Sequence, residues 1–171
     1  MTQALDALEY RRVVGRFATG VTVVTAALDG EHHAMTCNSF TSVSLDPVLV
    51  LFCPEKVARF HDVVLAAGQW AVSVLGQSHE PASRLFARRG RPIEDQFTGV
   101  AHTYGPLTGA AVLDGALASL ECRTVSTTDA GDHTVVIGEV LGLGVPDPDG
   151  DPLLYYEGRY RAFCDVTGPG A

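Results

Sequence analysis

The sequence predicts a mainly β protein, an antiparallel barrel with peripheral helices. Short runs rich in β-branched and aromatic residues recur along the chain, separated by Gly, Pro, Asn and Asp turn signals. This pattern is typical of antiparallel sheets and barrels. Only a few segments show helical spacing of apolar residues, and the sequence contains no G-x-G-x-x-G motif. A doubly wound, dinucleotide-binding parallel sheet is therefore not expected.

The first predicted element is a helix over residues 3–18. Leu5, Leu8, Val13 and Phe17 fall on one face of it, with acidic side chains early and arginines late, an order that suits the helix dipole. Gly20 then stops the helix.

Strands are expected wherever apolar or β-branched runs meet turn signals. The Asp29-Gly30 pair predicts a hairpin turn, and Asp46-Pro47 separates a polar segment from a continuous apolar run that we expect to be buried on both faces. The predicted strands cover residues 21–27, a segment from His32, and residues 48–53, 69–75, 116–127, 133–145, 153–156 and 160–164.

Two further helices are predicted, over residues 57–67 with Gly68 as the stop, and from a Ser78 cap to Arg88. Residues 90–109 are rich in Gly and Pro and predict an irregular loop. The histidines at 32 and 33 flank the hairpin turn, so we expect exposed turn residues rather than metal ligands. Trp70 is expected in the core.

Length and composition indicate a globular chain of one domain, because 171 residues with 46% hydrophobic and 19% charged residues can form a sizeable core. The net charge of −8 disfavours nucleic acid and anionic membranes as partners. No segment approaches the ~20 apolar residues of a membrane span, and the N-terminus lacks a signal-peptide layout, so a cytoplasmic location is expected. The four cysteines form no C-x-x-C pair, which predicts free thiols and no structural zinc.

Residues 34–53 are the most informative stretch. Their first half is crowded with small hydroxyl and amide side chains, and their second half is the apolar run. Such a segment is either an irregular edge strand or a binding segment that holds a polar, partly anionic ligand by hydrogen bonds.

Four segments together resemble the flavin reductase-like domain family, the small reductase partners of two-component flavin monooxygenases. The central one is HAMTCNSFTSVSLDP, residues 33–47; the others are FATGVTVVT, residues 17–25, GDHT followed by IGEV, residues 131–140, and PLLYY with GRY, residues 152–160. They occur in the family order. The resemblance implies one flavin reductase-like domain over residues 1–171, with its core at about 11–163. It also implies a six-stranded, Greek-key split β-barrel and a homodimer with flavin near the subunit interface.

The resemblance also implies the flavin-binding positions. Residues Thr36 to Ser39 would contact the ribityl chain and phosphate, and Ser42 to Ser44 the ring edge. Relatives carry Ser and Thr after the apolar run, where this chain has charged side chains that would bind phosphate through charge, and this leaves FMN versus FAD open. The full set of cofactor-binding candidates is Thr36, Cys37, Asn38, Ser39, Ser42, Val43, Ser44, Cys53, Lys56, Arg59 and Phe86.

Several side chains have two interpretations. His133 either is structural or, as the family's Gly-Asp-His motif implies, positions the nicotinamide of NADH or NADPH. Tyr160 is either a second wall of that site or a core aromatic residue. Cys37 is either a packed or a redox-active thiol. The arginines at 84, 88, 89 and 91 form either a solvated helix end or a phosphate contact.

The predicted function is an NAD(P)H:flavin oxidoreductase that transfers hydride to FMN or FAD and supplies reduced flavin to a partner monooxygenase. One alternative is a non-catalytic flavin- or haem-binding split-barrel protein. Another is a flavin-dependent enzyme that acts directly on an organic substrate. The Gly-Asp-His motif favours the reductase, because a simple binder needs no nicotinamide wall.

Overall fold

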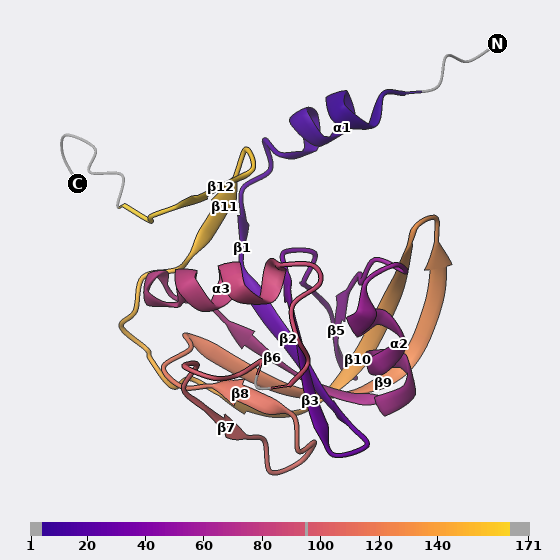
Figure 1. Cartoon of the computed structure of the whole chain (residues 1–171), viewed down its shortest axis with the longest axis vertical. Coiled ribbons are helices and arrows are strands. Elements are labelled where there is room, and N and C mark those ends of the chain that lie inside the picture. Colours follow the sequence, from indigo (N-terminus) through magenta and orange to yellow (C-terminus); the bar gives the residue numbers. More distant parts are fainter. Residues whose placement is uncertain (1–4, 95, 165–171) are drawn as a thin grey trace.

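The computed structural model describes residues 5–94 and 96–164. Strands dominate this part of the chain, with a few short helices at its surface (Figure 1). The helices are α1 (Ala7–Val14), α2 (Arg59–Ala67) and α3 (Glu80–Ala87), with a 3-10 turn η1 (Gln77–His79) before α3. The strands are β1 (Thr19–Gly20), β2 (Thr22–Leu28), β3 (Glu31–Cys37), β4 (Thr41–Leu45), β5 (Val48–Phe52), β6 (Gln69–Val74), β7 (His102–Tyr104), β8 (Ala111–Leu113), β9 (Ala118–Ala130), β10 (His133–Gly144), β11 (Leu154–Tyr156) and β12 (Arg159–Arg161).

The main sheet is antiparallel and has seven strands in the order β3-β2-β6-β9-β10-β5-β4. Its two end strands, β3 and β4, follow each other in the chain but do not pair, so the sheet is not closed as a barrel. The six-stranded split barrel is therefore not confirmed, although the mainly β, antiparallel class is. β1, β11 and β12 form a separate small sheet, and β7 pairs with β8.

Two apolar clusters lie between the sheet and the helices. One gathers Phe52, Phe60 and Trp70 beside α2, and the other gathers Leu75, Phe86 and Leu113 beside α3. Trp70 is fully buried and packs edge-on against Phe52, which confirms it as a core residue. Figure 1 shows α2 and α3 lying over the sheet.

The turns follow the local sequence closely. Asp29 and Gly30 both have positive φ, 52° and 81°, as the tight turn between β2 and β3 requires. Gly68 ends α2 in the left-handed conformation. Ser78 does not cap α3, because the backbone there first makes the 3-10 turn and the serine hydroxyl instead meets His79 Nδ1.

The predicted burial of residues 48–53 on both faces is wrong. β5 alternates instead: Val50 and Phe52 are buried, whereas the side chain of Val48 is exposed. Helices cover one face of the sheet here, and nothing in the described part of the chain buries the other face completely.

The N-terminal helix is shorter than predicted and projects away from the sheet (Figure 1). α1 begins after the Asp6 cap and ends at Val14, before the Gly15 cap, while positions 3 and 4 of the predicted helix lie outside the described residues. None of its residues is buried. A short helix without a packing partner gains little stability beyond its own turns, which explains why the apolar periodicity overestimates its length. No helix in the described residues has the length and apolar character needed to cross a membrane.

Candidate functional site

A cavity of about 590 Å³ opens where the end of β3 meets the start of α2 and the end of α3. The segment after β5 and the start of β10 complete it. The lining consists of His33, Ala34, Met35, Thr36, Cys37, Asn38, Ser39, Cys53, Glu55, Val57, Ala58, Arg59, Phe60, Phe86, Ala87, Arg88, Arg89, Gly90, Arg91, Gln96 and His133. A volume of this size is within the range of small-molecule and cofactor sites.

The structure brings together most of the residues that the sequence singled out. The predicted site residues that line this cavity are Thr36, Cys37, Asn38, Ser39, Cys53, Arg59, Phe86 and His133. They come from segments far apart in the chain, and the topology of the sheet places them around one space.

The ring-edge candidates Ser42, Val43 and Ser44 do not line the cavity. They lie on the end strand β4, where a bulge between Ser42 and Ser44 leaves Val43 without a partner on β5. The hydroxyl of Ser44 accepts a hydrogen bond from the backbone N–H of Asp46 at 3.2 Å, so this side chain serves the turn.

Lys56 and Tyr160 do not line the cavity either. Lys56 Nζ is 3.0 Å from Asp129 Oδ1 at the tip of the β9–β10 hairpin, so its charge faces that tip. The Tyr160 hydroxyl is 2.7 Å from Ser83 Oγ, and its ring lines a different cavity.

Ser39 organises the floor of the cavity. Its hydroxyl accepts from the backbone N–H of Cys53 at 2.9 Å and lies 3.0 Å from Cys37 Sγ. This ties the end of β3 to the segment after β5. Burial raises the pKa of both the Cys37 and the Cys53 thiols, so both stay protonated near neutral pH. The packed interpretation of Cys37 is favoured, because the thiolate is the reactive form.

Arg91 lies at the centre of the basic side of the cavity. Its guanidinium donates to the backbone carbonyls of Ala34, Phe86 and Arg88, and so holds the end of α3 against β3. Its Nε is buried and has no partner in the described residues. Burial and the nearby Arg59 lower the pKa of Arg91.

Two further arginines contribute to the basic side of the cavity. Arg59 donates from Nη1 to the backbone carbonyl of Arg91 at 3.0 Å, and Arg89 pairs with Glu55. Arginines thus exceed carboxylates around the cavity. That excess of positive charge fits an anionic group such as a flavin phosphate.

The sequence left open whether Arg84, Arg88, Arg89 and Arg91 form a solvated helix end or a phosphate contact, and it did not predict Glu55 or His33 as site residues. The signal available for Arg91 was the arginine cluster itself. The carbonyls that Arg91 binds belong to β3 and to the end of α3. The sequence pattern does not predict that these two elements lie close together.

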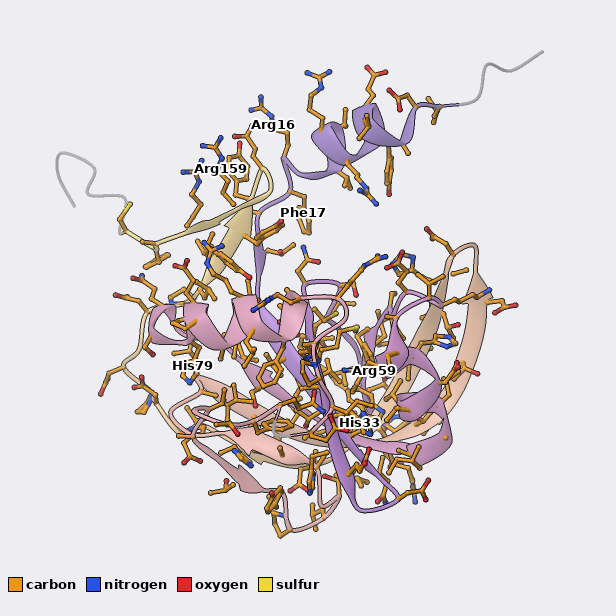
Figure 2. All side chains as sticks on the ribbon, in the orientation of Figure 1. Arg16, Phe17, His33, Arg59, His79 and Arg159 are labelled. Atoms are coloured by element: carbon orange, nitrogen blue, oxygen red, sulfur yellow. The ribbon has the colours of Figure 1, made fainter. Side chains whose placement is uncertain are left out.

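His33 is buried, with 7% of its surface exposed, so the prediction of an exposed turn residue is wrong. It lies in β3 one residue beyond His32, and Figure 2 shows it next to Arg59. Burial is the main cause that lowers the pKa of His33, and the nearby Arg59 and Arg91 act in the same direction, against Glu31.

His133 is the first residue of β10, and both its side chain and its backbone make contacts that fix its position. Its Nδ1 is 2.7 Å from Asp132 Oδ1, and its backbone forms a bridge with Glu55. This contact with His133 lowers the pKa of Asp132. The imidazole is thus oriented by its neighbour while the ring lines the cavity. Within the described ranges, no cluster of His, Cys, Asp or Glu side chains could hold a metal ion.

Comparison with known proteins identifies relatives over almost the whole chain. The model of the flavin reductase like domain matches residues 14–163. An NADH-dependent FAD reductase of Streptomyces globisporus is 45% identical over 166 residues, which are 96% of this chain and 90% of that protein. The NADH-dependent FMN reductase SmoA of Agrobacterium fabrum is 41% identical over 154 residues, 90% of this chain and 84% of that protein.

Solved structures agree with the sequence relatives. BorF, the flavin reductase component of a bacterial two-component tryptophan halogenase, superposes with a TM-score of 0.88 at 43% identity, over 94% of this chain and 99% of that one. The NADH:FAD oxidoreductase SgcE6 of Streptomyces globisporus, in complex with NAD and FAD fragments, gives 0.89 at 40% identity, over 98% and 100%. The chain belongs to the flavin reductase-like domain family.

Proposed function

We propose that the chain is an NADH-dependent flavin reductase whose flavin occupies the cavity at the end of β3. One observation carries this proposal. The chain folds so that hydroxyl, amide and guanidinium groups from β3, α2 and the segment after α3 surround a single space, and His133 of the Gly-Asp-His motif borders the same space.

When bound there, a flavin supplies the hydride acceptor, and NADH is the donor. The residues of the chain bind the flavin and orient it. Arg59 and Arg91 provide positive charge for a phosphate, the Asn38 amide provides a polar group beside it, and Phe86 provides an apolar wall. The hydroxyls of Thr36 and Ser39 are bonded within the protein and shape the cavity beside these groups.

We assign His133 a positioning role towards the nicotinamide. Hydride transfer needs no general base; it needs the donor and acceptor atoms held about 3–3.5 Å apart. Asp132 fixes the imidazole through Nδ1, which supports an orienting role.

The names of the relatives guide the remaining assignments. One relative is an FAD reductase and another an FMN reductase, so either flavin fits. Relatives in Mycobacterium tuberculosis and Rhodococcus jostii are reductase subunits of a flavin-dependent monooxygenase. On that basis we propose that this chain passes reduced flavin to a separate monooxygenase.

At the level of the whole chain, we propose one domain over residues 1–171 and a cytoplasmic location. The free thiols of Cys37, Cys53, Cys122 and Cys164 support a reducing compartment. We also propose that the open sheet corresponds to the six-stranded split barrel of the family, and that two copies form a homodimer. The exposed apolar side chains of α1 and β5 support the dimer.

The direct test is the oxidation of NADH by the purified protein with and without added FMN or FAD. We expect oxidation only when flavin is present. Flavin binding without NADH oxidation would instead support the non-catalytic binder, and oxidation that needs a further organic substrate would support the other alternative.

A further inference from the structure

His61 is a buried histidine of α2 that lies behind the wall of the cavity at the end of β3. Only 9% of its surface is exposed. Its neighbours Arg59 and Phe60 line the cavity, whereas His61 does not. A buried polar side chain is stable only when its hydrogen bonds are made. The partners of His61 therefore show which parts of the fold it holds together.

The imidazole of His61 lies between a carboxylate and a hydroxyl. Its Nδ1 is 2.7 Å from Asp62 Oδ1, and its Nε2 is 2.9 Å from Thr134 Oγ1. A carboxylate only accepts hydrogen bonds, so Nδ1–H donates to Asp62. In the neutral ring, Nε2 then accepts from the hydroxyl of Thr134. Asp62 thus orients the imidazole towards β10.

Thr134 directly follows His133 at the start of β10. The backbone here is bonded to the segment before α2. The N–H of Thr134 donates to the carbonyl of Pro54 at 3.1 Å, and the N–H of Lys56 donates to the carbonyl of Asp132 at 2.9 Å. These bonds hold the strand to residues 54–56, but they do not reach α2 itself.

The bond between His61 and Thr134 joins α2 to the start of β10. In the part of the chain that the structure describes, no other hydrogen bond connects these two elements. α2 carries Arg59 on the basic side of the cavity, and the start of β10 carries His133 at its border. The bond therefore fixes the position of His133 relative to Arg59.

We propose that His61 is a positioning residue that acts through Thr134 to hold His133 against the nicotinamide. The proposal rests on the proposed function, which assigns His133 to that site. Hydride transfer is sensitive to the separation of the donor and acceptor atoms, and a small displacement of a positioning group slows it. His61 thus contributes to the reaction without lining the cavity.

The first test removes the hydroxyl that His61 binds. Thr134→Val keeps the β-branched shape, and we expect it to lower kcat/KM for NADH about fivefold while the dissociation constant of the flavin changes little. Thr134→Ser keeps a hydroxyl and should restore the rate. Thr128→Val is the matched control, because it makes the same change at an exposed position of the paired strand β9. It should behave like wild type.

A double-mutant cycle separates positioning from a general structural role. If His61 and Thr134 act through His133, Thr134→Val should cause little further loss of kcat/KM in a protein that already carries His133→Ala. An equal loss in both backgrounds would show that the bond only supports the fold, and would overturn the proposal.

Asp62→Ala is the second variant, and it decides the matter if Thr134→Val does not fold. The side chain of Asp62 is 92% exposed, so its removal leaves the core intact. It releases Nδ1 of His61 and should lower kcat/KM for NADH about twofold, again only when His133 is present. Asp149→Ala makes the same change at an exposed position of another loop and should have no effect. Equal kinetics in the two variants would overturn the proposal.

Nuclear magnetic resonance of the flavin-free full chain with ¹⁵N-labelled histidine gives a readout that is independent of turnover. We expect His61 to be protonated at Nδ1, and the ring signals of His133 to shift in Asp62→Ala but not in Asp149→Ala. Unchanged signals of His133 would overturn the proposal even if the protein oxidises NADH. A shift in a protein that does not oxidise NADH would support the link from His61 to His133 and contradict the proposed function instead.

Discussion

His133 is the residue on which the proposed reaction depends most. If it positions the nicotinamide, His133→Ala should lower kcat/KM for NADH about 10-fold, roughly 1.4 kcal/mol of lost transition-state stabilisation. Flavin affinity should change much less, because Arg59, Arg91 and the residues of β3 remain in place. Steady-state kinetics and a fluorescence titration of flavin measure the two effects separately.

The matched control is His79→Ala, since this histidine lies outside the cavity and binds the backbone carbonyl of Asp114. Figure 2 shows it at a distance from His33 and Arg59. Wild-type NADH kinetics in His133→Ala would contradict the positioning role, as would a loss of activity that follows the loss of bound flavin.

Ser39 shows what the sequence alone could not predict about the site. The motif around Ser39 predicted a binding segment, and its residues up to Ser39 do line the cavity. The hydroxyl of Ser39, however, is bonded within the protein, to the Cys53 backbone and near Cys37. A residue type shows which hydrogen bonds are possible, whereas the fold decides whether the partner is a ligand or a neighbouring strand.

Among the elements, strand β3 predicts a dependence of stability on pH. His32 and His33 both lie on this strand, and burial is the first cause that lowers the pKa of each below its ordinary value of 6.5, with His102 adding to the effect on His32. Between the folded pKa and 6.5, the unfolded chain binds more protons than the folded chain. Stability is therefore complete above pH 6.5 and is lost as the pH falls.

We expect the urea midpoint to fall between about pH 7.5 and about pH 5.5, and to fall less in His33→Gln, which has no titrating group at that position. If His33→Gln loses as much stability as wild type over this range, burial of His33 does not cause the pH dependence.

Local sequence signals predict most elements correctly. The incorrect predictions of elements share one cause. The Asp29-Gly30 turn, the glycine stop of α2 and the buried Trp70 are properties of short segments. The length of α1, the one-sided burial of β5 and the seven-stranded open sheet depend on what packs against each element. Periodicity identifies a face that can be buried but not the surface that buries it.

At the scale of the molecule, the exposed apolar side chains predict association. Leu5, Leu8, Val13 and Phe17 of the N-terminal segment are 61% exposed or more. Light scattering at micromolar concentration should therefore give a mass of twice 18.1 kDa. Changing Leu8 and Phe17 to Ser should shift the protein towards monomer, whereas changing Arg12 to Ser should not. A wild-type mass of 18.1 kDa would exclude the dimer.

The proposed reaction moves hydride from NADH to a flavin held in the cavity at the end of β3. Anaerobic rapid mixing of the flavin-loaded protein with NADH tests it most directly. We predict that the visible absorbance of the flavin bleaches far faster than with free flavin and NADH alone. The bleaching should slow when the transferred hydrogen of NADH is replaced by deuterium. Absorbance that stays unchanged although flavin remains bound would contradict the claim.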